Sequence, residues 1–532
     1  MRRWIVAVVA AGASCGLSLP SIAVAQSLAV GDPIEDYLRT LQILGKADLG
    51  GSFTVRPLSA DRASIGDVHP WGARETGLAA DRPLVLLDPR LRTFLNSSYP
   101  VGQNDGAVWQ GKGITTALDF GATASWGALS LTLHPTLIYN QNTSFELGVG
   151  TVTGLPVYAY PWRLIDMPQR FGPDAFWTLD PGQSELRVDW GGGTAGVSTA
   201  NQWWGPAVRN PIIMSNNAPG FPHAFLGTDG QVDTGIGAFE ARWIWGRLTQ
   251  SDWFDPAANT RRFVTGLVAT YSPSPLDGLS LGFTRLFYGY IPADRLPVSD
   301  YFAVLGGLRK KTLVSPQNPT GDDEHDQMIS LFGRWVLRES GFEVYWEWAR
   351  NDHAWALRDF VLEPEHSQAY TLGLRKAYAL SGDRLLALTG ELTHLERSTT
   401  YEIRANPTYY AHAIVTQGYT QEGQVVGSGL GPGGGGQHLG AELFAPWGRA
   451  GLYVERHMRD NDAYYPWAVA NATNEPYCCH DVSLNLGANA LVFVGDFDLG
   501  AGFIATHEYH RYFYGLDLSN LNLSLSARWR RR

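Results

Sequence analysis

Short segments in which apolar and polar residues alternate recur along most of the chain, and they limit its fold more than any other feature. In the last such segment, Leu521, Leu523 and Leu525 alternate with asparagine and serine. A period of two puts apolar side chains on one face of a β-strand and polar ones on the other. Paired segments occur at 113–123 with 128–140, 236–249 with 261–272, 329–337 with 341–350, 367–379 with 383–396, 437–445 with 449–457, and 480–493 with 496–509.

A soluble antiparallel sheet would alternate in the same way, but two observations favour a membrane barrel. The pattern repeats over about 16 to 18 segments of about ten residues, the size range of porins. The sequence is also rich in glycine and aromatics, with 60 Gly, 19 Trp, 23 Tyr and 22 Phe. We therefore predict an all-β fold, a large antiparallel transmembrane β-barrel over 112–532. Such a sheet must close, because unpaired strand edges cannot be satisfied in hydrocarbon.

The N-terminus has the three-part pattern of a secretory signal peptide over residues 1–25. Arg2 and Arg3 precede an apolar run, and Ala23-Val24-Ala25 ends it, so we expect the mature chain to begin at Gln26 in the outer membrane. Removing the signal lowers the formal net charge from −10 to −12, which gives no indication of a nucleic-acid partner.

Residues 26–111 are predicted to form a small periplasmic or plugging element with one short helix. Asp32 can cap a helix, Pro33 suits its first position, and Glu35 completes a capping box. Apolar residues then share one face as far as Leu44, which predicts a helix over 33–44.

No arrangement typical of an enzyme or of a cofactor or metal site is found in the sequence. The glycines at 427–436 lack the flanking residues of a nucleophile elbow or a phosphate loop. His480 and Ser483 point to opposite faces of a strand, which argues against a hydrolase. Cys478 and Cys479 are neighbours that can form only a strained vicinal bridge or stay reduced.

Two segments that combine aromatic rings with amides and carboxylates are candidates for binding a sugar. Rings cover the apolar face of a pyranose, while amides and carboxylates bind its hydroxyls. The alternative is that both segments fold inward and brace the barrel wall. The candidate residues are Asn104, Asp105, Trp109, Trp203, Trp204, Asn210, Asn216, Asn217 and His223.

These segments carry a resemblance to a known family. Tyr99-Pro100, Trp109-Gln110-Gly111-Lys112-Gly113, Trp203-Trp204-Gly205-Pro206, Met214-Ser215-Asn216-Asn217-Ala218 and Gly220-Phe221-Pro222-His223 resemble the Wzi capsule-assembly family. The resemblance is densest over about 94–290 and implies an 18-stranded barrel with a helical part on the periplasmic side. It also implies a lectin-like protein that holds capsular or other extracellular polysaccharide at the cell surface. Outer-membrane lipid and the outer-membrane assembly machinery are the other expected partners.

A diffusion porin or sugar channel is the alternative function. Charged residues expected on the inward face would suit a charged constriction, but they would equally suit a wet, salt-bridged wall. These residues are Glu240, Arg242, Arg334, Arg338, Glu343 and Glu347.

Overall fold

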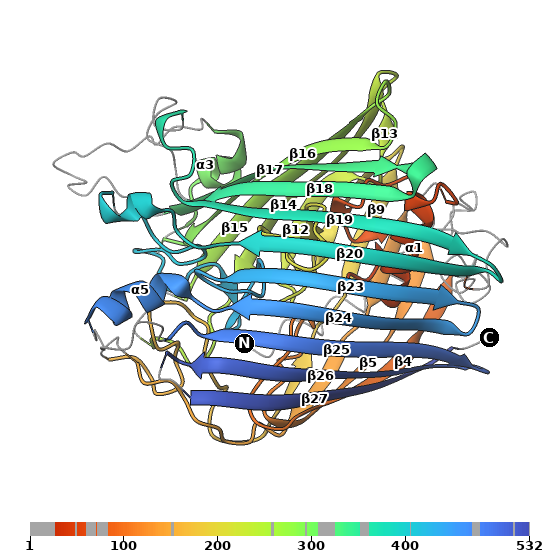
Figure 1. Cartoon of the computed structure of the whole chain (residues 1–532). Coiled ribbons are helices and arrows are strands. Elements are labelled where there is room, and N and C mark those ends of the chain that lie inside the picture. Colours follow the sequence, from red (N-terminus) through yellow and green to blue (C-terminus); the bar gives the residue numbers. More distant parts are fainter. Residues whose placement is uncertain are drawn as a thin grey trace, which may run out of the picture.

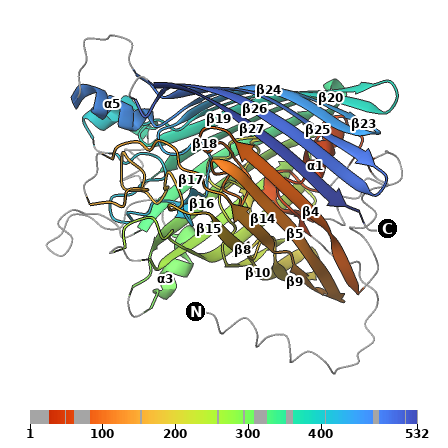
Figure 2. The same cartoon turned by 90° about the horizontal axis from the view of Figure 1, so that it is seen from below.

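The computed structural model shows a closed antiparallel barrel (Figures 1 and 2). It describes residues 27–47, 50–59, 71, 83–150, 154–256, 260–292, 295–306, 325–351, 361–404, 406–470, 479–513 and 516–530. The signal segment and Cys478 lie outside these residues, and Cys479 is disulfide-bonded. In the described part of the chain the wall has 18 strands, which confirms the number that the resemblance implies.

Three of these strands are broken into two pieces each, namely β6 (Leu129–Leu133) with β7 (Thr136–Asn140), β8 (Phe176–Asp180) with β9 (Glu185–Trp190), and β12 (His223–Thr228) with β13 (Val232–Asp233). The unbroken strands are β4 (Leu84–Asn96), β5 (Gly113–Trp126), β10 (Gly193–Ser198), β14 (Gly237–Leu248), β15 (Arg262–Pro273), β16 (Leu279–Tyr290), β17 (His325–Leu337), β18 (Phe342–Asn351), β19 (Gln368–Leu380), β20 (Arg384–His394), β23 (Gly435–Ala445), β24 (Gly448–Met458), β25 (Val482–Val494), β26 (Phe497–Arg511) and β27 (Leu516–Trp529).

Short turns join the strands at one end of the barrel, and most connections at the other end are long. The tight links at 339–341 and 381–383 belong to the short-turn end. The long connections carry α3 (Val298–Tyr301), η2 (Ala303–Leu305), η4 (Thr399–Glu402), α5 (Asn461–Ala470), β11 (Trp203–Trp204), β21 (Thr420–Gln421) and β22 (Gln424–Val425). In Figure 1, α3 and α5 mark the long-loop end.

The predicted alternation of faces is confirmed in β18. Val344 and Trp346 are exposed on the outside of the wall, whereas Glu343, Tyr345 and Glu347 are buried inside it. Leucines on other strands show the same outward exposure, up to 64% for Leu452 on β24. The outer face is therefore apolar, as a wall in contact with lipid requires. No helix in the described part of the chain is long and apolar enough to cross a membrane.

The wall closes where the last strand, β27, pairs with the first, β4, over Asn522–Arg528 against Asn96–Arg90. The barrel therefore begins at Leu84, and the sequence-based boundary at 112 placed it too late. Pro89 lies inside β4, and the register shifts between Leu87 and Arg90. This bulge interrupts the alternation from which a strand is predicted.

The predicted N-terminal helix is present as α1 (Pro33–Ile43), inside the lumen near the short-turn end (Figures 1 and 2). The Asp32 side chain caps it by accepting from the Ile34 N–H, and Glu35 accepts from the Gly31 N–H at 2.7 Å. Tyr37, Leu38 and Leu41 pack against wall residues of β20 and β23. Beside it, β1 (Ser27–Leu28) pairs with β3 (Leu58–Ser59), and β2 (Val55–Arg56) pairs with β11.

Two of the long connections, 199–222 and 395–434, also fold into the lumen. Their apolar side chains, including Ile212, Met214 and Tyr410, form one core with the inner face of β14–β17. Inward residues such as Val264 and Leu286 belong to this core, so parts of β15 and β16 carry apolar side chains on both faces.

Candidate functional site

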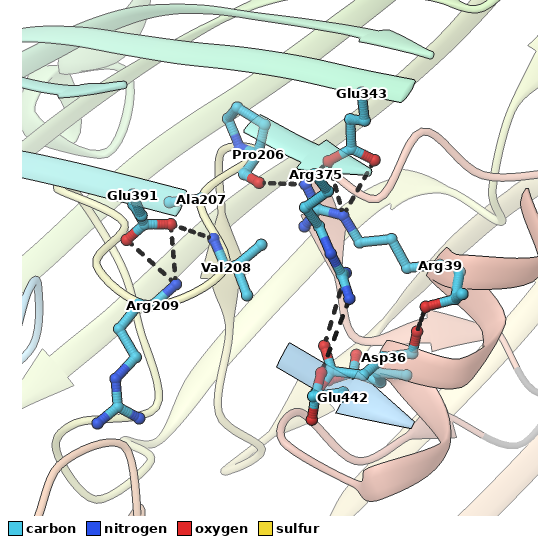
Figure 3. Close-up of polar contacts among 12 residues, drawn as sticks. Asp36, Arg39, Pro206, Ala207, Val208, Arg209, Glu343, Arg375, Glu391 and Glu442 are labelled. Atoms are coloured by element: carbon cyan, nitrogen blue, oxygen red, sulfur yellow. Dashed lines mark hydrogen bonds and ion pairs between the residues drawn. The ribbon is translucent and has the colours of Figure 1, made fainter. Parts of the chain in front are cut away.

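The lumenal helix α1 is bound to the wall by buried ion pairs. The Glu343 carboxylate on β18 accepts a hydrogen bond from the Arg39 Nε at 3.0 Å and one from the Arg334 Nη2 at 2.7 Å. Arg39 also donates to the Pro206 carbonyl at 2.7 Å (Figure 3). Helix, wall and the 199–222 connection are therefore held together at one point.

A second buried carboxylate fixes the 199–222 connection. Glu391 on β20 accepts from the backbone N–H groups of Val208 at 2.7 Å, Arg209 at 3.1 Å and Asn210 at 2.7 Å. Figure 3 shows this contact beside the Arg39 cluster. Glu391 was not among the candidate residues, although it lies at a polar position of the alternating segment 383–396.

The charges expected inside the lumen also serve as anchors, with one exception. Glu240 accepts from the Ser52 hydroxyl at 2.6 Å, Arg242 donates to Gln202 at 3.1 Å, and Glu347 accepts from the Ile212 N–H at 3.1 Å. All three are buried against internal segments, like Arg334 and Glu343.

The exception is Arg338, which does not face the lumen. It follows the end of β17 in the one-turn helix η3 (Arg338–Ser340), where the strand alternation no longer applies. Its side chain is exposed and pairs with Asp277 in the neighbouring turn at 3.2 Å.

The two tryptophans proposed to stack on sugar are buried, which favours the bracing interpretation for them. Trp204 is 0% exposed within the lumenal core, and Trp203 is 4% exposed. The Arg56 guanidinium lies 4.4 Å from the Trp203 ring centre, and the Trp203 Nε1 donates to the Ala207 carbonyl. In this conformation neither ring presents a face to a ligand.

Four further candidates also make internal contacts. Asn210 Oδ1 accepts from Gln103 at 2.6 Å, and Asn217 donates to the Val425 carbonyl at 2.9 Å. The remaining two are His223, whose Nδ1 lies 2.8 Å from the Phe221 carbonyl, and Trp109, whose ring packs on Phe171.

The other three candidates, Asn104, Asp105 and Asn216, line a cavity of about 950 Å³. It lies between α1 and the wall formed by β4–β9 and β25–β27, and it extends to the 495–496 turn at the short-turn end. Its lining mixes apolar side chains with amides, carboxylates, hydroxyls and arginines. Its volume falls within the usual range of ligand sites, about 300–1,000 Å³.

Comparison with known proteins gives the family. Residues 97–463 match the family model described as capsule assembly protein Wzi. The chain belongs to this family. Among solved structures, Wzi of Escherichia coli, an outer-membrane protein involved in group 1 capsule assembly and described as a carbohydrate-binding β-barrel, aligns with a TM-score of 0.62 at 13% identity. That alignment covers 95% of this chain and 100% of the other.

Two further solved structures align less well. OccAB2 of Acinetobacter baumannii aligns with a TM-score of 0.40 at 11% identity, over 83% of this chain and 97% of the other. OccD3 of Pseudomonas aeruginosa gives 0.39 at 10% identity, over 84% and 91%. No curated protein sequence matches the chain.

In this Wzi-family barrel, burial changes the acidity of carboxyl groups near the cavity. Asp105 accepts from Gln110 at 2.6 Å, and burial raises its pKa. Burial also raises the pKa of Glu35 on α1 to about 7, against the opposing effect of Arg56, whose nearest contact is 3.4 Å away. The long contact explains why burial dominates.

Four arginines line the cavity in this Wzi-family barrel. Arg90 and Arg92 flank Leu91 on β4, and Arg528 and Arg530 flank Trp529. Arg528 lies on the polar face of the alternating last segment, as its sequence indicates, whereas Arg90 and Arg92 were not singled out, although they keep the same period of two.

Proposed function

We propose that this protein binds capsular or other extracellular polysaccharide and holds it at the cell surface. The observation that carries the proposal is the filled lumen of a Wzi-family barrel. One helix and two long connections are hydrogen-bonded to the inner wall where a diffusion porin keeps an open, water-filled channel. A filled barrel favours a binding role over transport.

The polar side chains in the cavity lining are of the kind that bind sugar hydroxyls. Amides donate and accept, and carboxylates accept, so together they can satisfy both functions of a hydroxyl. We include Asn104, Asp105 and Asn216 in the proposed site because they line this cavity. Trp203 and Trp204 are left out because both are buried. Binding requires no chemical step, so the proposal does not include catalysis.

Two measurements test the proposal. Purified, detergent-folded protein should bind polysaccharide isolated from the producing cells, and loss of surface polysaccharide should follow deletion of the gene. In planar bilayers the same protein should give little conductance. Failure to bind any surface polysaccharide, together with large steady channels, would refute the proposal and favour the porin.

A further inference from the structure

Two arginines face each other across the strand pair that closes the barrel. Arg90 on β4 and Arg528 on β27 are register partners, and both line the cavity. Arg92 is two residues farther along the same inward face of β4. Like charges directly opposite each other on a sheet are destabilising, so an anion bound between these arginines would stabilise the closure.

The carboxylates near Arg90 are already engaged by its neighbours. Asp32 accepts from the Arg528 Nη2 at 2.5 Å and also caps α1. Asp119 accepts from both the Nε and the Nη2 of Arg92, at 3.0 and 2.9 Å. Each of these two acids therefore neutralises another arginine.

Arg90 itself has no such partner. Within the described part of the chain, no acceptor forms a hydrogen bond or ion pair with its guanidinium, although Asp32 and Asp119 act on it electrostatically. It is partly buried in the cavity wall. A guanidinium in this position offers a fork of N–H donors that matches a carboxylate or a phosphate.

We infer that Arg90 binds the carboxylate of an acidic sugar in the cavity. The inference rests on the proposed function, because it names the class of polysaccharide that the site would take. Arg90 would pair with the carboxylate, while Asp105, Asn104 and Asn216 at the inner end of the cavity would bind hydroxyls of the same glycan. The bound anion would also relieve the repulsion between Arg90 and Arg528.

The test uses purified full-length protein in detergent and three probes. These are a tetrasaccharide of alternating glucuronate and N-acetylglucosamine, its carboxyl-reduced neutral counterpart, and inorganic phosphate. Arg90→Gln removes the positive charge, whereas Arg90→Lys keeps the charge but lacks the paired N–H donors of the guanidinium. Arg338→Gln is the matched control, since Arg338 lies at the same end of the barrel but outside the cavity.

We expect the acidic tetrasaccharide to bind the unaltered protein about tenfold more tightly than it binds Arg90→Gln, a difference of about 1.4 kcal/mol, because the variant loses a charge-assisted hydrogen bond. Arg90→Lys should fall between the two, and Arg338→Gln should bind as the unaltered protein does. The acidic probe should raise the melting temperature of the unaltered protein but not that of Arg90→Gln.

Equal affinity of the acidic probe for the unaltered protein and for a folded Arg90 variant would overturn the inference. Should Arg90→Gln fail to fold, the comparison with Arg90→Lys decides in the same way. Phosphate binding as tightly as the tetrasaccharide would overturn the assignment to a sugar. The proposed function fails separately, if the unaltered protein binds no isolated surface polysaccharide of any charge.

Discussion

Replacing Glu343 by glutamine should loosen the lumenal helix and weaken the whole barrel. Glu343 accepts charge-assisted hydrogen bonds from both Arg39 and Arg334 and is 0% exposed. In Glu343→Gln the two guanidinium groups would remain buried without their shared counter-charge. Breaking a buried pair in this way costs about 3–5 kcal/mol, so we expect a loss of that size in the free energy of unfolding.

Urea unfolding of the detergent-folded protein, followed by tryptophan fluorescence, measures this loss. Because Arg39 ties α1 to the wall, the same variant should also show increased conductance in planar bilayers. The control is Arg338→Gln, which breaks an exposed pair worth at most about 1 kcal/mol and should leave both properties nearly unchanged. A Glu343→Gln protein as stable and as poorly conducting as the unaltered one would refute the anchoring argument.

Three further predictions follow from the fold. Deleting Leu521–Arg532 should block surface assembly, because β27 bonds to both of its neighbours at the closure; normal display in whole-cell labelling would contradict this. Changing Trp203 and Trp204 together to alanine should lower the free energy of unfolding by several kcal/mol and spare polysaccharide affinity, and lost affinity in a stable barrel would oppose it. Since Glu35 has a pKa of about 7 when folded and 4.5 in its ordinary state, stability should fall as the pH rises between these values, and Glu35→Gln should reduce that slope in urea unfolding at pH 5 and pH 8.

Period-two alternation was sufficient to predict most of the wall. The two faces of β18 follow the predicted alternation, because lipid and a polar interior impose opposite requirements on Val344 and Glu343. The rule failed where local geometry departs from a regular strand. Pro89 and its bulge hid β4, and the turn after Leu337 reversed the expected direction of Arg338.

The interior was less predictable than the wall, because composition does not tell whether a polar-aromatic segment faces solvent or a cavity. Trp203 lies in a segment rich in amides, yet it packs beneath Arg56, which is far away in the sequence. Such contacts depend on how the 199–222 connection folds back into the barrel. Arg90 meets Arg528 only because β4 and β27, the two ends of the wall, lie side by side.

Parts of β15 and β16 carry apolar side chains on both faces, and this has a consequence for the chain before it folds. A strand with one polar face keeps some solubility in water, but a segment such as 262–273 offers apolar side chains on either side. Segments of high β-propensity and low charge are prone to aggregate while they are exposed. We therefore expect these segments to depend more on chaperones, before the barrel assembles in the membrane, than the evenly alternating strands do.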